Sequence, residues 1–188
     1  MAEHAPGGAG SGAASGAPVA TGRAVVVTVS TSAAAGTAAD RSGPLLVDGL
    51  RGLGLDTPDA RVVPDGDAVA DALRSALADG ADVVLLTGGT GLSPDDTTPE
   101  QVRPLLEREV PGIAEALRAD GRARGVATAA LSRSVAGVAG RSLVVALPGS
   151  TGACRDALEV LGPLLPHAVA LLGGTPGERL HPGGRGDA

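Results

Sequence analysis

The chain alternates continuous apolar runs with segments whose apolar residues recur at helical spacing. A continuous apolar run is typical of a strand that is buried on both faces, as in a parallel sheet. The runs at 81–87 and 141–147 each end in a glycine-rich turn. This pattern predicts strands at 23–30, 61–64, 81–87, 127–133, 135–138 and 141–147.

Between these runs, leucine, valine and alanine recur every three or four residues, which indicates amphipathic helices. Pro104, Pro163 and Pro166 interrupt the spacing, because an interior proline removes a hydrogen bond and clashes with the preceding turn. Strands alternating with helices predict a single α/β domain over 23–173, a three-layer α/β/α sandwich on a largely parallel sheet. The predicted helices are 42–54, 67–80, one starting at 98 and broken near 104, then 113–121, 153–161 and 167–172.

Several of these helices carry recognisable start signals. Ser42 followed by Pro44 fits a cap with an early proline, and Asp67 is a plausible N-cap of the next helix. Thr98 and Gln101 have the spacing of a capping box, with Pro99 at the first helical position. The polar segment that follows the first strand is expected to be either a ligand-binding loop or a plain surface loop.

The ends of the chain differ from its middle. Residues 1–22 and 174–188 are rich in small residues and proline and lack periodicity, so both are expected to be disordered tails. No apolar run reaches the length of a membrane span, and the N-terminus lacks the pattern of a secretory signal. Cys154 is the single cysteine, which excludes an internal disulfide and favours a cytoplasmic protein.

Composition narrows the possible partners. The formal net charge is −6, which argues against binding to nucleic acid or to an acidic membrane. The chain has no aromatic residue, so a base cannot stack on a side chain. All 15 basic residues are arginine. A core without aromatics must be built from valine, leucine, isoleucine and alanine, which requires close packing of the backbone.

The stretch 81–100 is the strongest candidate for chemistry. A buried strand leads into the glycine-rich turn 87–91, then into the adjacent carboxylates of Asp95 and Asp96, and then into a helix. Backbone N–H groups of such a turn can surround an anion. Two carboxylates near a phosphate require a cation between them, and Mg²⁺ meets that need with oxygen ligands. The alternative is a structural turn in which one acid only caps the helix.

A second glycine-rich turn, 148–152, joins a strand to a helix. A helix N-terminus binds anions through its free N–H groups and its dipole. Ser150 or Thr151 would serve as a cap, as a ligand donor, or as both. Cys154 lies in the first turn of this helix, where its pKa could be lowered, but packing is the expected role because no basic partner is visible.

Several longer motifs occur between about residues 23 and 173. They are Val63–Asp65, Thr87–Glu100, Arg108–Gly112, Leu131–Arg133, Val135–Gly140, Leu147–Ser150 and Leu165–His167. In residues and order, these motifs resemble the MogA/MoaB-like family of molybdenum cofactor biosynthesis. The resemblance implies a Mg²⁺-dependent molybdopterin adenylyltransferase, which transfers AMP from ATP to the terminal phosphate of molybdopterin and releases pyrophosphate.

The resemblance also implies roles for individual residues. The two functional acids fall on Asp65 and Asp96, which we expect to be catalytic and to hold Mg²⁺. An arginine such as Arg133 is a further candidate, which could help Mg²⁺ to offset the charge on the leaving pyrophosphate. The expected nucleotide- and pterin-binding residues are Ser30, Thr87, Gly88, Gly89, Thr90, Gly91, Pro148, Gly149 and Ser150.

Four positions depart from the family pattern. Thr31 and Ser32 replace the Asp-Arg or Asn-Arg pair that often follows the first strand, and Asp95 stands where the family often has arginine. Ala146 replaces a common asparagine before Leu-Pro-Gly. These changes leave a non-catalytic molybdopterin-binding paralogue as the alternative function, and a domain acting on another pterin or nucleotide as a third. The family implies a homotrimer or hexamer, with the molybdate-insertion protein as a further partner.

Overall fold

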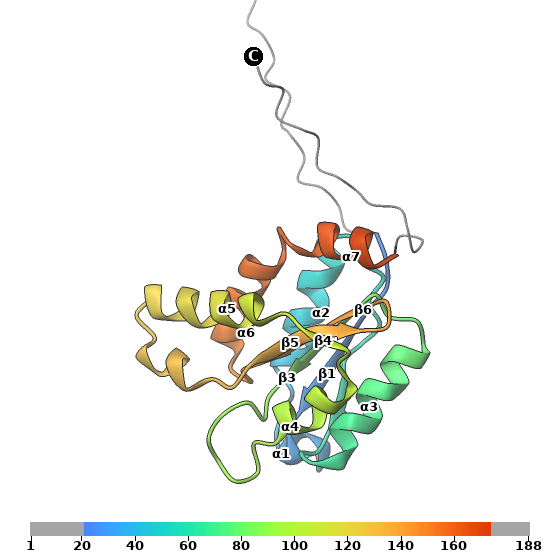
Figure 1. Ribbon diagram of the computed structural model, residues 1–188. Helices are drawn as coiled ribbons and strands as arrows, with labels where there is room; N and C mark the ends of the chain where they lie inside the picture. The colour runs from blue at the N-terminus through green and yellow to red at the C-terminus, as the bar shows by residue number, and fades with distance from the viewer. Residues whose placement is uncertain (1–20, 174–188) are drawn as a thin grey trace, which may run out of the picture.

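The computed structural model describes residues 21–173, so both predicted tails lie outside the described part except for Thr21 and Gly22. Six strands form one sheet in the order β2-β1-β3-β6-β5-β4, flanked by helices on both faces (Figure 1). The predicted three-layer α/β architecture is confirmed. The strands are β1 (Ala24–Val29), β2 (Arg61–Val63), β3 (Val83–Thr87), β4 (Arg108–Glu109), β5 (Val135–Ala139) and β6 (Ser142–Leu147).

The helices cover the two faces of the sheet in separate groups (Figure 1). The buried residues of α2, α5, α6 and α7 join one core cluster, and those of α3 and α4 join the other. In β1, Ala24 and Val26 face the first cluster while Val25, Val27 and Val29 face the second, as the two-residue period of a strand requires. The helices are α1 (Thr31–Ala34), α2 (Ser42–Gly52), α3 (Asp67–Ala78), α4 (Thr98–Val102), α5 (Pro111–Ala123), α6 (Thr151–Leu161) and α7 (Leu165–Gly173).

Of the six described strands, five run in one direction and β5 runs against them near one side of the sheet. β2, β1, β3 and β6 run parallel, whereas β5 pairs antiparallel with both β6 and β4. The β5–β6 hairpin turns through Gly140 at a φ of +58°, a conformation that suits glycine. The sheet is therefore largely parallel, as predicted.

Close backbone packing replaces aromatic side chains in the core. A Cβ added at Gly49 of α2 would lie 2.3 Å from a methyl of Leu158 in α6. The two helices thus pack closely because Gly49 leaves room for the Leu158 side chain. Within residues 21–173 no single helix has the length and hydropathy of a membrane span. Only when α6 and α7, which are bent by 63° at their junction, are taken together do they reach that length and hydropathy.

Three segments differ from the predicted elements, and one of them is the two-residue strand β4, for which no strand was predicted. Residues Ala127–Leu131 form a 3₁₀ helix, η2, and not a strand. This segment packs on α5, where a Cβ added at Gly121 would lie 2.8 Å from Ala129, and its alanines do not favour a strand. The segment after β1, predicted to be a loop, contains the short helix α1, which Ser30 caps by accepting from Ala33 N at 3.3 Å.

The predicted helix starts are partly wrong. Asp40, and not Ser42, caps α2, since its carboxylate accepts from the N–H groups of Ser42 and Gly43. Gly66 occupies the N-cap of α3, so Asp67 is the first helical residue.

The capping box at α4 is also absent. Thr98 is the first helical residue, with its backbone N–H bonded to Gly89 O at 3.0 Å. The Gln101 side chain donates to Asp67 instead of reaching back. The break near Pro104 is confirmed, because α4 gives way there to the 3₁₀ turn Arg103–Leu105, η1.

Candidate active site

The main pocket lies where the parallel strands β3 and β6 end. The glycine-rich loops that follow them, 88–91 and 148–150, both line a pocket of about 630 Å³. The loops touch, because a Cβ added at Gly149 would lie 3.2 Å from Gly88 Cα. In open α/β sheets, ligands bind outside the carboxyl ends of the strands, so this position favours a ligand site.

The first loop presents backbone N–H groups to the pocket. Gly88 and Gly89 have φ values of +108° and +61°, which glycine adopts without strain. Gly88 N–H is used by Leu147 O at 3.0 Å, so it is not available to a ligand. Among residues 21–173, the N–H groups of Gly89, Thr90 and Gly91 have no protein acceptor, and all three residues line the pocket.

Asp96 is the acid at the pocket wall. Its Oδ2 accepts from Ser93 N at 2.9 Å and lies 2.8 Å from where a Cβ of Gly91 would stand. Its neighbour Asp95 is exposed and does not line the pocket. The extra negative charge that departs from the family pattern therefore lies outside the pocket lining.

Asp65 lies beside the same loop but on a different glycine. Its Oδ1 lies 2.9 Å from where a Cβ of Gly89 would stand. Its Oδ2 accepts from the Thr31 hydroxyl at 2.8 Å and from Thr31 N at 3.3 Å. Thr31, a departure from the family pattern, thus holds Asp65 in place. Asp65 and Asp96 share no hydrogen bond within the described part of the chain.

Arg133 holds the loop between β3 and α4. Its backbone N–H donates to Thr90 O at 2.9 Å, and its Nε donates to Gly91 O at 2.8 Å. Its remaining nitrogens bond Asp96 O and the Glu100 carboxylate. Each guanidinium nitrogen has a protein acceptor, and Arg133 does not line the pocket, so its contacts serve to position the loop.

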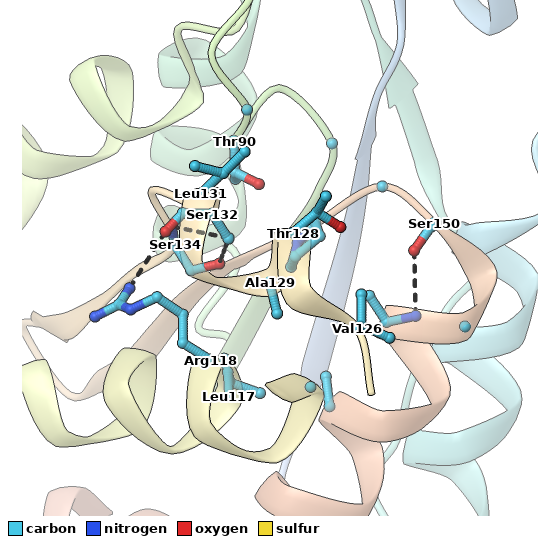
Figure 2. Close-up of a pocket in the computed structure, with 18 of the residues that line it drawn as sticks. Thr90, Leu117, Arg118, Val126, Thr128, Ala129, Leu131, Ser132, Ser134 and Ser150 are labelled. Carbon is cyan, nitrogen blue, oxygen red and sulfur yellow. Dashed lines mark hydrogen bonds between the residues drawn. The ribbon is translucent and has the colours of Figure 1, made fainter. Parts of the chain in front are cut away.

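The second loop begins α6. Ser150 caps this helix by accepting from Ala153 N at 3.2 Å, as Figure 2 shows. Gly152 and Ala153 of the first turn also line the pocket. The positive end of an eleven-residue helix therefore faces the cavity and favours an anion there.

Two predicted site residues lie next to the main pocket and not in it. Thr87 is fully buried, and its hydroxyl donates to Pro148 O at 3.0 Å. Thr87 and Ser30 both line a second cavity of about 300 Å³, which shares Gly149 with the main pocket. The structure thus gathers the other seven predicted binding residues and Asp96 around one pocket, with Asp65, Thr87 and Ser30 at its margins.

Cys154 has a packing role. It is fully buried, with its Sγ 3.3 Å from the Thr87 hydroxyl. Burial raises the pKa of the Cys154 thiol above its ordinary value, and the hydrogen bond to Thr87 opposes that rise. The burial of Cys154 agrees with the packing role that the sequence predicts, and burial outweighs any lowering of the pKa by the helix start.

One wall of the pocket was missed by the sequence analysis. η2 contributes an apolar surface, on which Val126 and Leu131 are 46% and 55% exposed, together with the hydroxyl of Thr128 (Figure 2). Thr128 and Leu131 lie in the segment that was expected to be a strand, and Val126 directly precedes it, so no pattern pointed to them. An apolar wall opposite polar loops suits a ligand with both a ring system and phosphates.

Arg118 of α5 also lines the pocket and was not predicted. It donates to Ser132 O at 3.4 Å, and Figure 2 shows it below the Ser132–Ser134 pair. The other charged residues at the pocket are Asp96 and Asp156, so Arg118 is its one lining cation among the described residues. Its spacing on α5 is helical, which gave no signal of a site.

Comparison with known proteins identifies relatives of the whole described domain. The MoCF_biosynth family model, described as a probable molybdopterin binding domain, matches residues 25–167. A molybdenum cofactor biosynthesis bifunctional protein of Synechococcus elongatus is 46% identical over 153 residues, 81% of this chain and 48% of the relative. A molybdopterin adenylyltransferase of Pyrococcus furiosus is 38% identical over 141 residues, 72% of this chain and 82% of the relative.

Solved structures give the same result. A MogA structure matches with a TM-score of 0.78 and 45% identity, covering 80% of this chain and 99% of MogA. MoaB of Thermus thermophilus matches with a TM-score of 0.76 and 42% identity, covering 82% and 98% of the two chains. The chain spans about half the length of the bifunctional curated relatives, at 48% and 49%. The chain therefore belongs to the MogA/MoaB-like family of molybdopterin-binding domains.

Proposed function

We propose that this protein acts in molybdenum cofactor biosynthesis as a molybdopterin adenylyltransferase. The observation that supports this proposal is the pocket where β3 and β6 end. It is lined by residues with unpaired backbone N–H groups, by the start of α6 and by Asp96. An oxygen of the molybdopterin phosphate would attack the α-phosphorus of ATP. The bond from that phosphorus to the bridging oxygen would break, and its electron pair would leave with pyrophosphate.

The residues present suit a reaction of this kind. Nucleotidyl transfer depends on positioning and charge stabilisation, and the phosphate nucleophile is already ionised. The N–H groups of Gly89, Thr90 and Gly91 and the start of α6 would bind phosphate oxygens. The apolar wall of η2 would contact a heterocycle by packing, since the chain offers no aromatic side chain.

Asp65 and Asp96 fit Mg²⁺ if the substrate completes the coordination. Their carboxylate oxygens are hard ligands, and a Cβ would fill the space beside Asp65 at Gly89. Among residues 21–173 no three His, Cys, Asp or Glu side chains form a metal cluster. Mg²⁺ held this way would offset the negative charge on the triphosphate and on departing pyrophosphate.

The test compares two neighbouring acids. Purified protein is incubated with molybdopterin, ATP and Mg²⁺, and adenylated pterin is separated by anion exchange. Asp96→Asn is expected to lower kcat by about 100-fold or more, because Asp96 lines the pocket. Asp95→Asn, the matched control, is expected to retain activity, because Asp95 is exposed outside the pocket.

The same assay decides between the enzyme and the non-catalytic alternative. Folded wild-type protein that binds molybdopterin but forms no product above a protein-free control would overturn the proposal. Equal losses in both variants would remove the specific role of Asp96.

A further inference from the structure

Thr98 carries a buried hydroxyl that the fold does not use. The residue is fully buried, and its Oγ1 has no hydrogen-bond partner within the described part of the chain. A buried polar group normally finds a partner, so an unpaired one calls for an explanation. Thr98 begins α4 and is tied to the glycine loop by its backbone bond to Gly89 O.

The unpaired hydroxyl and Asp65 face the same side of Gly89. A Cβ added at Gly89 would lie 2.3 Å from Thr98 Oγ1 and 2.9 Å from Asp65 Oδ1. The two oxygens are therefore no farther apart than the sum of these distances, and no hydrogen bond joins them. Glycine at this position keeps the space between them free of protein.

The orientation of Asp65 is fixed by Thr31. The Thr31 hydroxyl and backbone N–H both donate to Asp65 Oδ2. Thr31 Oγ1 also accepts from Asp65 N at 3.3 Å. Because Oδ2 is occupied in this way, Oδ1 is the carboxylate oxygen left to face Gly89.

We propose that Thr98 Oγ1 and Asp65 Oδ1 are paired ligands of a divalent cation, with Thr31 as the residue that positions Asp65. A carboxylate beside a hydroxyl offers two hard oxygens, which suit Mg²⁺ and Mn²⁺ and repel an anion. This assignment rests on the proposed function, because phosphate oxygens of ATP and water would supply the other ligands. It adds Thr98 and Thr31 to a site that the sequence assigned to carboxylates alone.

The experiment uses Mn²⁺ as the probe and Thr97 as the internal control. Thr97 Oγ1 is also buried and has no partner among the described residues, but no atom of Thr97 is among the three nearest to a Cβ placed at Gly89. Free Mn²⁺ is measured by electron paramagnetic resonance during titration of the full chain, with and without a non-hydrolysable ATP analogue. Thermal unfolding of each metal-free variant is followed by far-ultraviolet circular dichroism.

Thr98→Val is expected to weaken Mn²⁺ binding about tenfold or more, while its metal-free Tm stays equal or rises, because an unpaired buried hydroxyl has been removed. Thr97→Val is expected to behave similarly in Tm but to bind Mn²⁺ as the wild type does. Thr98→Ser, which keeps the hydroxyl, is expected to restore binding. Thr31→Val is expected to weaken binding by a smaller factor.

Wild-type affinity in Thr98→Val, or no Mn²⁺ binding by the wild type in either condition, would overturn the proposal. If Thr98→Val fails to fold, Thr31→Val decides, and wild-type affinity in that variant also overturns it. The adenylation assay separates this inference from the proposed function. If Thr98→Val binds Mn²⁺ more weakly and the wild type is inactive, the cation site stands and the proposed enzymatic function is wrong. If Thr98→Val binds Mn²⁺ as the wild type does and the wild type is active, the enzymatic function stands and the cation site is wrong.

Discussion

Asp95 and Asp96 are adjacent in sequence, yet the fold gives their side chains different surroundings. Asp96 is tied to Ser93 N and lines the pocket, whereas Asp95 is exposed. From sequence alone, Asp95 is a negative charge next to the expected polyphosphate site. The structure reduces it to a surface charge that water screens.

Asp95→Arg is therefore expected to change activity little. The substitution restores the residue that the family often has, but it acts only through a screened surface field. We expect KM for ATP to fall by less than about threefold, with kcat unchanged, since exposed charge pairs contribute little. Steady-state kinetics at physiological salt checks this. A gain of two orders of magnitude in kcat would show that the native chain is impaired.

Cys154 makes the alkaline stability of this protein unusually simple to interpret. The chain has no lysine and no tyrosine, so above about pH 8.5 the thiol is the main side chain that titrates before arginine. Burial raises the pKa of Cys154 in the folded state. The folded state therefore keeps a proton that the unfolded state has lost, and the free energy of unfolding must fall as pH rises above the unfolded pKa.

Denaturant unfolding between about pH 7 and pH 11 measures this effect. The free energy of unfolding of the wild type is expected to decline from about pH 8.5 upward. Cys154→Ala is expected to start lower, because it leaves a cavity, but to show no such decline. Parallel pH profiles for the two proteins would contradict the assignment to Cys154.

At the scale of elements, the loop between β3 and α4 depends on a side chain from outside it. Arg133 follows η2, yet its guanidinium bonds Gly91 O, Asp96 O and Glu100. The planar fork of arginine can reach several acceptors at once, whereas lysine offers one point charge. The shape of the loop between β3 and α4 is therefore set by the segment after η2.

Arg133→Lys is expected to lower kcat/KM about tenfold to 100-fold, because a displaced loop misplaces Asp96 and the N–H groups. The Tm is expected to fall by only a few degrees. Hydrogen exchange of the amides between 89 and 97 should accelerate in this variant. The matched control is Arg103→Lys, whose exposed ion pair with Glu109 lies at 3.1 Å. Unchanged exchange in Arg133→Lys would show that the loop holds its own shape.

The sequence predicted β3, β6 and the glycine-rich loops that follow them, but not the apolar wall that η2 adds to the pocket. Continuous apolar runs identify β1, β3 and β6, and the glycines after β3 and β6 mark the loops that line the pocket. η2 was not predictable in this way, because its five residues have no clear period and pack on α5, which lies earlier in the chain. Arg133 likewise shows its role only when the chain brings it back to Gly91 O.

The scale of the whole molecule sets how anionic substrates approach. The chain carries a net charge of −6, and both proposed substrates are anions. Binding must therefore come from the N–H groups at the pocket and from Arg118, while the electric field of the whole molecule opposes the approach of an anion. Such a field is screened beyond about 10 Å at 0.1 M salt, whereas contacts inside the pocket are screened much less.

The association rate constant of MgATP is therefore expected to rise as ionic strength increases from about 10 mM to about 150 mM. This is opposite in sign to a site served by a basic surface, where salt slows association. Stopped-flow mixing with a fluorescent ATP analogue measures the rate, since the chain contains no tryptophan or tyrosine to report binding. Labelled adenosine, which carries no phosphate charge, is the control, and its rate should not depend on salt. A rate constant for the ATP analogue that falls steeply with salt would mean that positive charge near the pocket outweighs the field of the whole molecule.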